Sequence, residues 1–468
     1  MGSTNIVWLR NDLRIADNEA LSAATSAGAT AVAVYIHETT KGVRPPGAAA
    51  RWWLNRSLES LVAALAERGI ALVIRTGDAS LVLPAVVAEF DARRVFWNRR
   101  YAPGERDADT AIMAGLKYDG IAVQSFAGNL LVEPWDIATG EGKPYSVFTP
   151  FWKRLREMPI AAPRRRPAAD KPIASKRIDT DYKAPAWSHK LAAHWNIGET
   201  AAHDRLVAFL DEQLMDYAEG RDFPASASTS RLSPHLRFGE ISARQIWHAA
   251  QAVAHADHSR QAAVDKFLSE LAWRDFNYHQ LYHRDDIATQ PMQPKYAGVV
   301  WRKAEADLAA WQRGQTGIPI VDAGMRELWE TGFMQNRVRM LTASLLAKNL
   351  LVDWRKGEQW FWDCLVDADM ANNPGNWQWV AGSGMDASPY FRIFNPVTQG
   401  GRFDGAGDYA RQWVPELAQL PDAWIHNPAE APADVLRKAG VVLGETYPKP
   451  IVDLKSSRAR ALEAVKGL

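Results

Sequence analysis

The sequence predicts an α/β N-terminal domain, built on a doubly wound parallel five-stranded sheet, followed by a large all-α C-terminal domain. In residues 1–130, short β-branched apolar segments alternate with stretches of helical periodicity, as expected for a parallel sheet with helices on both faces. Residues 131–190 are rich in Pro, Arg and Lys, which is typical of an interdomain linker. Residues 191–468 are dominated by helical periodicity, so we place the second domain there.

Five short apolar runs are the predicted strands: residues 6–9, 31–36, 72–75, 94–97 and 122–126. Between the second and third of these, residues 51–68 have the pattern of an amphipathic helix. The turn after the first strand reads RNDLRIADN and lacks G-x-G-x-x-G. The sequence therefore does not support a nicotinamide or flavin cofactor on this N-terminal domain.

The C-terminal half predicts stacked helices with no repeat period. Thr200, Ser242 and Asp322 are predicted N-caps, and Gly332 is a predicted helix stop. In the linker, the basic run PRRRPAADKPIASKR could contact DNA, but a solvated connecting segment is the favoured interpretation, because runs of charge are commonly solvated.

Composition limits the classes of function. The chain has 55 Lys plus Arg against 54 Asp plus Glu, so any binding of nucleic acid would need a local patch of charge. Its single cysteine, Cys364, excludes a disulfide framework and a thiolate metal cluster, and it fits a reducing compartment. We find no membrane-spanning run and no signal peptide, and we therefore expect a soluble, cytoplasmic protein.

Three groups of polar residues in the helical half could bind a ligand. Thr229, Ser230 and Ser233 surround Arg231 just before a helix, an arrangement suited to phosphate, although a Ser-rich loop with a helix cap is the competing interpretation. Glu270, Trp273 and Arg274 share one helix face by their spacing. A lined cleft and a surface ion pair beside a buried Trp both fit that face.

The third group consists of Asn336, Arg339 and Met340. Asn336 and Met340 are four residues apart on a predicted helix, and Arg339 stands beside Met340 in the sequence. Arg339 could pair with a buried acid such as Asp367, which would favour an anionic ligand nearby. An amphipathic helix with an exposed Asn and a core Met is the alternative.

Residues 365–394 form the most unusual segment, because acids, amides and two Trp residues stand among glycines. Asp367, Asp369 and Asn373 would each cost several kcal/mol if buried without partners, so they indicate a polar ligand. Trp377 and Trp379 are two residues apart and must point in different directions. Metal ligation is the rival interpretation, but the segment has too few alternating carboxylates for a hard cation.

The same segments resemble the photolyase and cryptochrome family, most closely the cyclobutane pyrimidine dimer (CPD) photolyases with the class I-type fold. The similarity covers nearly the whole chain. It rests on the segments WLRNDLRIADNEAL, GRDFPASASTSRLSPHLRFGEIS, ELAWRDF, WQRGQTGIPIVDAGMRELWETGFMQNRVRM, NNPGNWQW and SPYFRIFNPVTQGGRFD.

The resemblance implies a helical domain that binds FAD, which works as the reduced anion. It places Asp367 and Asp369 on polar atoms of the isoalloxazine and ribityl groups, Arg339 beside Asp367, and Asn373 at flavin N5. Plant cryptochromes typically have Asp in place of Asn373, so this residue favours a repair enzyme. The residues implied for the phosphates and ribityl chain are Tyr217, Thr229, Ser230, Leu232, Ser233 and Arg274.

The resemblance also implies UV-damaged DNA as the substrate, with the dimer flipped into a pocket. The pocket residues would be Glu270, Trp273, Asn336, Met340 and Trp379. Arg337 and Arg392 are candidates for phosphate contacts. Those assigned to catalysis are Glu270, Asn336, Asn373 and Trp379. Because (6-4) photolyases carry two His residues at the positions of Asn336 and Met340, the resemblance favours CPD repair.

Further implications concern light and electrons. Trp377, Trp354 and Trp301 would form, from inside to outside, the chain that photoreduces the flavin. An antenna pigment is implied on the N-terminal domain, a methenyltetrahydrofolate or an 8-hydroxydeazaflavin, with Glu105 as its one recognisable ligand. The neighbouring Asn of some folate-binding relatives is Gly104 here, which leaves open both the identity of the pigment and whether one is bound at all. We predict no metal and no obligate protein partner, and a monomer.

Two other classes of function are a signalling cryptochrome and a flavin oxidoreductase. A signalling cryptochrome is the alternative, but the dimer-pocket residues are all present and the chain ends shortly after YPKPIVDL, without a long tail. A flavin oxidoreductase that works in the dark would need a dinucleotide fold, which the first turn contradicts.

Overall fold

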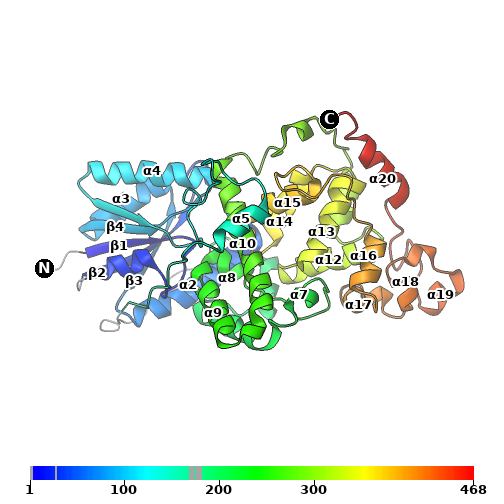
Figure 1. Cartoon of the computed structure of the whole chain (residues 1–468), viewed down its shortest axis with the longest axis horizontal. Coiled ribbons are helices and arrows are strands. Elements are labelled where there is room, and N and C mark those ends of the chain that lie inside the picture. The colour runs from blue at the N-terminus through cyan, green and yellow to red at the C-terminus, as the bar shows by residue number, and fades with distance from the viewer. Residues whose placement is uncertain (1–3, 27–28, 168–172, 174–181) are drawn as a thin grey trace. The chain divides into compact units, whose positions relative to one another are not determined.

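The structure is a computed structural model that describes residues 4–26, 29–167, 173 and 182–468 (Figure 1). It divides into two compact units, each made of separate stretches of the chain. Unit 1 comprises Met1–Met215, Ser230–Asp285 and Val366–Ala371, and unit 2 comprises Asp216–Thr229, Asp286–Leu365 and Asn372–Leu468. The predicted helical domain thus contributes to both units, while the predicted boundaries at 130 and 190 stay a prediction.

Unit 1 contains the predicted five-stranded parallel sheet. Its strands are β1 (Thr4–Leu9), β2 (Thr30–Glu38), β3 (Ala71–Gly77), β4 (Ala92–Asn98) and β5 (Ala122–Phe126). The strand order is β3-β2-β1-β4-β5, and all pairs are parallel. After β3 the chain returns to the other side of β1, so the sheet is doubly wound. Each predicted strand falls within an observed one, which confirms the predicted fold class.

Helices pack on the sheet, and Figure 1 shows α3 and α4 side by side on it. The helices of this part are α1 (Glu19–Ala24), α2 (Ala48–Ala66), α3 (Ala79–Glu89) and α4 (Pro103–Tyr118). The predicted helix at 51–68 corresponds to α2. Trp8 of β1 and Trp97 of β4 meet edge to face at 5.5 Å between ring centroids, and Leu83 of α3 packs in the same buried cluster.

Ion pairs fill the carboxyl edge of the sheet between β1 and β4, where ligands of doubly wound folds usually bind. Arg100 bonds Asp109 at 2.6 Å and also Glu38, and Arg10 reaches Asp109 at 3.3 Å. All four side chains are largely buried. This edge satisfies its own charges, in keeping with the absence of a dinucleotide fingerprint.

The rest of unit 1 is helical. Its elements are α5 (Phe148–Leu155), η2 (Ala186–Ala193), α6 (Glu199–Ala208), η3 (Phe209–Gln213), α8 (Ser233–Phe238), α9 (Ala243–Ala256), η4 (His258–Arg260) and α10 (Gln261–His283). Helix α5 lies inside the predicted linker. It is ordered because Phe148, Phe151 and Leu155 are buried on one face, with both Phe rings against Phe276 of α10. Most of the basic run after Pro167 lies outside the described residues.

Unit 2 is built from helices among its described residues. They are α7 (Tyr217–Gly220), η5 (Pro294–Gly298), α11 (Glu305–Gln312), α12 (Pro319–Thr331), α13 (Asn336–Ser344), η6 (Leu345–Asn349), α14 (Trp354–Cys364), α15 (Asn372–Ala381), α16 (Pro396–Phe403), α17 (Asp408–Trp413), η7 (Pro415–Leu417), α18 (Asp422–Ile425), η8 (Pro428–Glu430), α19 (Ala433–Lys438) and α20 (Leu454–Glu463). Across the described part of the chain, no helix has both the length and the apolar character needed to cross a membrane.

Two of the four predicted helix boundaries are correct. Ser242 caps α9 by accepting from the Gln245 amide, and Gly332 ends α12 in the left-handed conformation. The prediction for Thr200 is wrong, because α6 begins one residue earlier, after Gly198. The prediction for Asp322 is also wrong, because this residue lies inside the first turn of α12 and its buried carboxylate accepts from the Thr316 amide.

The loop after β1 is fastened to the helical part of unit 1 by buried polar contacts. Arg244 of α9 bonds Asp17 at 2.8 Å, and Arg14 donates to the carbonyl of Gly239 at 3.0 Å. Gly239 has φ +67° and stands so close to Asn11 that an added Cβ would overlap the Asn11 carbonyl. This position therefore needs glycine both for its backbone angle and for space.

We predict that Gly239→Ala lowers the free energy of unfolding by about 2–3 kcal/mol, because the new Cβ forces the loop and α8 apart. Chemical denaturation measures this change. Gly115→Ala is the matched control: Gly115 lies in α4 with nothing within 4 Å of an added Cβ, so this variant should gain about 0.5–1 kcal/mol. Equal stability of the two variants would contradict the assigned packing.

Candidate active site

The unusual segment at 365–394 is divided between the two units, and its first part belongs to unit 1. Asp367 and Asp369 are both buried. The Ser233 hydroxyl, at the start of α8, donates to Asp367 Oδ2 at 2.6 Å, and the Ala371 amide donates to Asp369 Oδ1 at 2.8 Å. Arg237 fixes the backbone between them by donating to the Ala368 carbonyl. Both carboxylates are therefore held in place by hydrogen bonds, and a carboxylate oxygen can accept from more than one donor.

The hydroxyl-rich loop before α8 has an unusual backbone. Arg231 adopts φ +50°, and its guanidinium lies 4.2 Å from the ring centre of Trp195. The Leu232 amide makes only a long contact, 3.5 Å, with the Ser230 hydroxyl. In unit 2, Tyr217 is buried with Arg221 over its ring at 5.5 Å, and Thr229 is half-buried. A role of this loop in phosphate binding stays a prediction.

Helix α10 gives its three predicted residues different surroundings. Glu270 pairs with Lys266 at 2.7 Å, one turn away, and both side chains are partly exposed. Trp273 is stacked on Phe148, with 3.8 Å between ring centroids and 10° between planes. Arg274 donates to the Asn129 carbonyl. The surface ion pair considered for this face therefore exists, and Trp273 is held rigidly beside it.

Helix α13 begins with exposed Asn336, whose Nδ2 lies 4.0 Å from Met340 Sδ. Arg337 is already paired with Asp222 at 2.6 Å, so a DNA phosphate would have to compete with this carboxylate. Arg339 donates to the Met334 carbonyl at 2.6 Å. Because Arg339 belongs to unit 2 and Asp367 to unit 1, their pairing stays a prediction.

Helix α15 separates its two Trp residues as their spacing predicts. Trp377 is buried, whereas Trp379 is half-buried. One turn earlier, Asn373 donates from Nδ2 to both the carboxylate and the carbonyl of Glu358, at 2.8 and 3.0 Å. These two bonds fix the orientation of the amide, and they leave its Oδ1 as the atom available to a ligand.

Of the three Trp residues in the predicted electron-transfer chain, Trp377 contacts other aromatic rings, but these rings belong to Phe361 and Trp311. Trp377 meets Phe361 at 5.0 Å and Trp311 at 6.1 Å, and its indole nitrogen is buried without a hydrogen-bond partner among the described residues. Trp354 is buried at the start of α14, and Trp301 is half-buried. An electron path through Trp377, Trp354 and Trp301 stays a prediction.

Two polar residues in this part of unit 2 were not predicted, namely Glu358 and Lys348. Both are buried. Glu358 follows Trp354 by one helical turn, which is a weak signal. Lys348 interrupts the apolar run LLAKNLL, and a lone cation in such a run indicates a buried charge with a specific role.

The antenna residue Glu105 serves the fold in this structure. Its carboxylate accepts from the Ala102 amide at 3.3 Å at the start of α4, and burial raises the pKa of Glu105. Gly104 stands against the backbone of Gly42, where an added Cβ would overlap the Gly42 carbonyl. An Asn therefore cannot occupy position 104 in this backbone, which explains the departure noted in the sequence.

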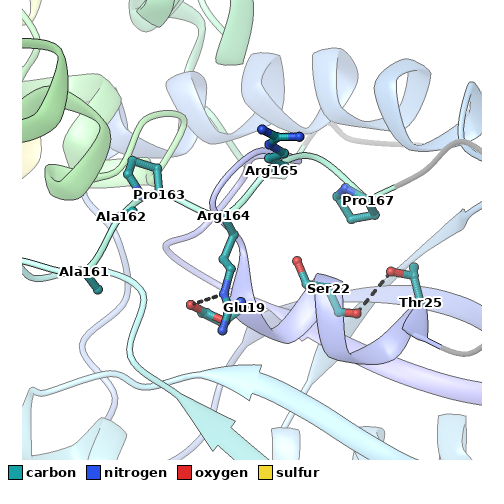
Figure 2. A pocket seen from close by; sticks show the side chains of 9 residues that line it. All are labelled: Glu19, Ser22, Thr25, Ala161, Ala162, Pro163, Arg164, Arg165 and Pro167. Carbon is teal, nitrogen blue, oxygen red and sulfur yellow. Dashed lines mark hydrogen bonds and ion pairs between the residues drawn. The ribbon is translucent and has the colours of Figure 1, made fainter. Parts of the chain in front are cut away.

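Unit 1 has a cavity of about 750 Å³ between α1 and the described end of the linker (Figure 2). It is lined by Glu19, Ser22, Thr25, Ala161, Ala162, Pro163, Arg164, Arg165 and Pro167. Arg164 is bonded to Glu19 at 3.0 Å, and Figure 2 shows Arg165 directed away from Ser22 and Thr25. None of the predicted site residues lines this cavity, and its nearest cation is neutralised, so we do not assign the active site to it.

Among the described residues, no group of three His, Cys, Asp or Glu side chains could hold a metal ion. Cys364 is buried and takes part in no disulfide. Within each unit, buried polar side chains of the segment at 365–394 are present, namely Asp367 and Asp369 in unit 1 and Asn373 in unit 2.

Comparison with known proteins gives consistent matches along the chain. Residues 5–169 match the family model described as DNA photolyase, and residues 267–467 match that of the FAD binding domain of DNA photolyase. A deoxyribodipyrimidine photo-lyase of Agrobacterium fabrum is 48% identical over 98% of this chain and 97% of its own. Cryptochrome-1 of Arabidopsis thaliana is 37% identical over 99% of this chain and 70% of its own.

Among solved structures, a bacterial class III photolyase from Agrobacterium tumefaciens is similar over 100% of this chain and 98% of its own, with a TM-score of 0.95 and 47% identity. The fold of this chain is therefore that of a known solved structure along its whole length.

The bond between Asn373 and Glu358 generates a prediction about stability. Asn373→Asp would place a second carboxylate against a buried one, and the two would share a proton. We expect the variant to lose about 3 kcal/mol of unfolding free energy at pH 8 and less at pH 5. In the variant, the two neighbouring carboxylates would hold a shared proton to a higher pH than an isolated carboxylate does. The variant therefore loses unfolding free energy as the pH rises and this proton leaves.

Denaturant unfolding at the two pH values measures the effect. Asn376→Asp on the same helix is the control: Asn376 is exposed, and its substitution should change stability by less than about 0.5 kcal/mol. A pH-independent Asn373→Asp variant would contradict the assigned orientation of the amide.

Proposed function

The chain belongs to the photolyase and cryptochrome family, and we propose that it is a deoxyribodipyrimidine photo-lyase that repairs cyclobutane pyrimidine dimers in DNA by light-driven electron transfer. The observation that supports this most directly is the 48% identity to such an enzyme over nearly the full length of both chains. The cryptochrome relative is more distant, at 37%.

The residues present fit FAD. Asp367 and Asp369 are buried acceptors suited to an imide N–H and to ribityl hydroxyls. The loop at 229–233 offers hydroxyls and amides for the phosphates. Asn373 Oδ1, left available by the bonds to Glu358, can accept from the N–H group that a reduced flavin carries. When bound, reduced FAD supplies the photoexcited electron that opens the cyclobutane ring and takes that electron back.

The protein's task is to hold the dimer and exclude water, since no side chain needs to act as a nucleophile. Trp273 and Trp379 supply flat apolar surfaces for the dimer, and Met340 supplies a deformable wall. Asn336 and Glu270 supply polar contacts to the base edges. Flipping a dimer out of the helix costs less than flipping a normal pair, because a dimer is already poorly stacked.

Contacts to the DNA backbone are proposed for Arg392 and Arg337. Arg392 is exposed and has no ion pair among the described residues, so its guanidinium is free to meet a phosphate. Arg337 must first exchange Asp222 for the phosphate. Phosphate contacts of this kind make binding dependent on salt and independent of sequence.

The subclass differs from the one that the sequence resemblance suggested. A class I-type assignment is not supported, and the similarity to a class III photolyase favours class III for this chain. We further propose a monomer in the cytoplasm, a reducing compartment that fits a chain with a single cysteine, Cys364. An antenna pigment, methenyltetrahydrofolate or 8-hydroxydeazaflavin, belongs to the proposal, and its position is left open.

The function is tested by illuminating the reduced, FAD-containing protein with a UV-irradiated oligonucleotide and measuring dimers over time. We expect dimers to disappear in the light and to persist in the dark. Loss of repair despite bound reduced FAD would contradict the enzyme assignment and favour a cryptochrome-type photoreceptor.

We predict that Glu270→Ala lowers the repair yield about tenfold or more while FAD remains bound, because a charged contact to the substrate contributes about 1.5–3 kcal/mol. Lys266→Ala is the matched control, since it removes the ion-pair partner and leaves the carboxylate in place. A surface ion pair alone contributes about 0–1 kcal/mol. Equal, small effects of both variants would show that Glu270 only pairs with Lys266.

A further inference from the structure

Lys348 is a completely buried cation that the proposed repair reaction does not use. It lies in η6, a single π-helical turn that continues directly from α13. Such turns are rare and concentrate at functional sites. Burying an ammonium group is costly unless the surroundings compensate it, so its retention in an apolar run requires an explanation.

The buried ammonium group of Lys348 is stabilised by contacts with the loop of residues 388–394. Lys348 Nζ donates to the Arg392 carbonyl at 3.0 Å and lies 5.2 Å from the ring centre of Tyr390. Within the described chain no carboxylate forms an ion pair with Lys348. The ammonium therefore rests on a carbonyl dipole and an aromatic face, and both belong to residues 388–394.

This loop, residues 388–394, is fastened at three points of unit 2. The Ser388 amide donates to the carbonyl of Trp379 at 3.2 Å, and the Phe394 amide reaches the Ser344 hydroxyl at 3.3 Å. Lys348 holds the middle, at the residue whose guanidinium is exposed. The cation thereby connects the helical run that starts at Asn336 with the loop that follows Trp379.

We propose that Lys348 is a positioning residue, which holds the loop of residues 388–394 so that the Arg392 guanidinium can meet a DNA phosphate beside the lesion. This inference rests on the proposed function and adds a residue with no direct contact to DNA. The charge of the ammonium strengthens the bond to the carbonyl, and it also adds to the positive field behind Arg392.

The charge of Lys348 is sensitive to its surroundings. Burial, and then the nearby Arg392, lower the pKa of Lys348 to about 7. The other titratable group that faces it is Tyr390, whose pKa burial raises to about 12. On α20, which packs against η6, Arg460 bonds the Asn349 carbonyl. A phosphate bound at Arg392 would favour the protonated ammonium, so binding should take up a proton near pH 7.

The sign of the pH dependence follows from this linkage. Well below pH 7, Lys348 is protonated with or without DNA, and the affinity is at its maximum. As pH rises from about 7 to 9, the free protein loses the proton and binding must restore it, so the affinity falls. A lysine that only fills space in the core would not produce this dependence.

The test measures the dissociation constant for dimer-containing DNA between pH 6 and 9 at constant salt, using FAD-containing protein. Lys348→Met keeps the length of the side chain and removes its charge. We expect about tenfold weaker binding than wild type at pH 6, a difference that narrows toward pH 9. Single-turnover repair of DNA that is already bound should be unchanged.

The control is Lys356→Met on α14, which removes a partly exposed cation that is paired with Glu305. This variant should keep the wild-type pH dependence. If Lys348→Met does not fold, Arg392→Gln provides the second variant, because it should flatten the pH dependence while Lys348 remains. Wild-type affinity independent of pH, or normal binding by Lys348→Met, would overturn the proposal. Wild-type protein that does not repair dimers would instead contradict the proposed function.

Discussion

Compensation of buried charge is the constraint on which the arrangement of both units depends. In unit 1, Asp17 and Arg244 fasten the loop after β1 to α9, and both side chains are almost fully buried. In unit 2, Glu358 is buried against Asn373, and Lys348 against a carbonyl and a ring. Each buried charge costs several kcal/mol unless it is paired or hydrogen-bonded. The partners are therefore fixed in position, and they fix the elements to which they belong.

The same constraint separates this α/β domain from cofactor-binding relatives of the same topology. The crevice at the carboxyl edge between β1 and β4 is the usual ligand position of a doubly wound sheet. In this chain Arg100 and Arg10 fill it with their bonds to Asp109. The proposed ligand-binding residues lie instead in loops and helices after the sheet, and among them Asp367 and Asn373 are buried.

Sequence periodicity predicted the sheet well and the contacts poorly. The five strands were found because short β-branched runs alternate with stretches of helical periodicity, which is the pattern of a parallel sheet covered by helices. The divergence of Trp377 and Trp379 followed from helix geometry alone. Helix α5 was missed because its short apolar face stands among Pro, Arg and Lys, and its formation depends on packing against α10. Local patterns cannot contain information of that kind.

The hydrogen-bond and ion-pair partners of the candidate site residues were the least predictable feature of the site. The roles of Asp367 and Asn373 came from resemblance to a family, whereas the bond from Ser233 to Asp367 and that from Asn373 to Glu358 came from the structure. Residues that meet across more than a hundred positions of sequence, such as Arg337 and Asp222, leave no periodic signal. The partners of Glu358 and Lys348 lie nearer in sequence, 15 and 44 residues away, but the choice of these partners also depends on tertiary packing.

The ion pair between Arg337 and Asp222 has a consequence for how a repair enzyme searches a genome. Attraction to undamaged DNA grows with the number of uncompensated cations, because each one releases a counterion from the duplex. A guanidinium masked by its own carboxylate adds little to that attraction. With total charge close to neutral, we expect weak attraction to intact DNA, and under the proposed function this arginine would contact a phosphate only where other contacts already hold the strand.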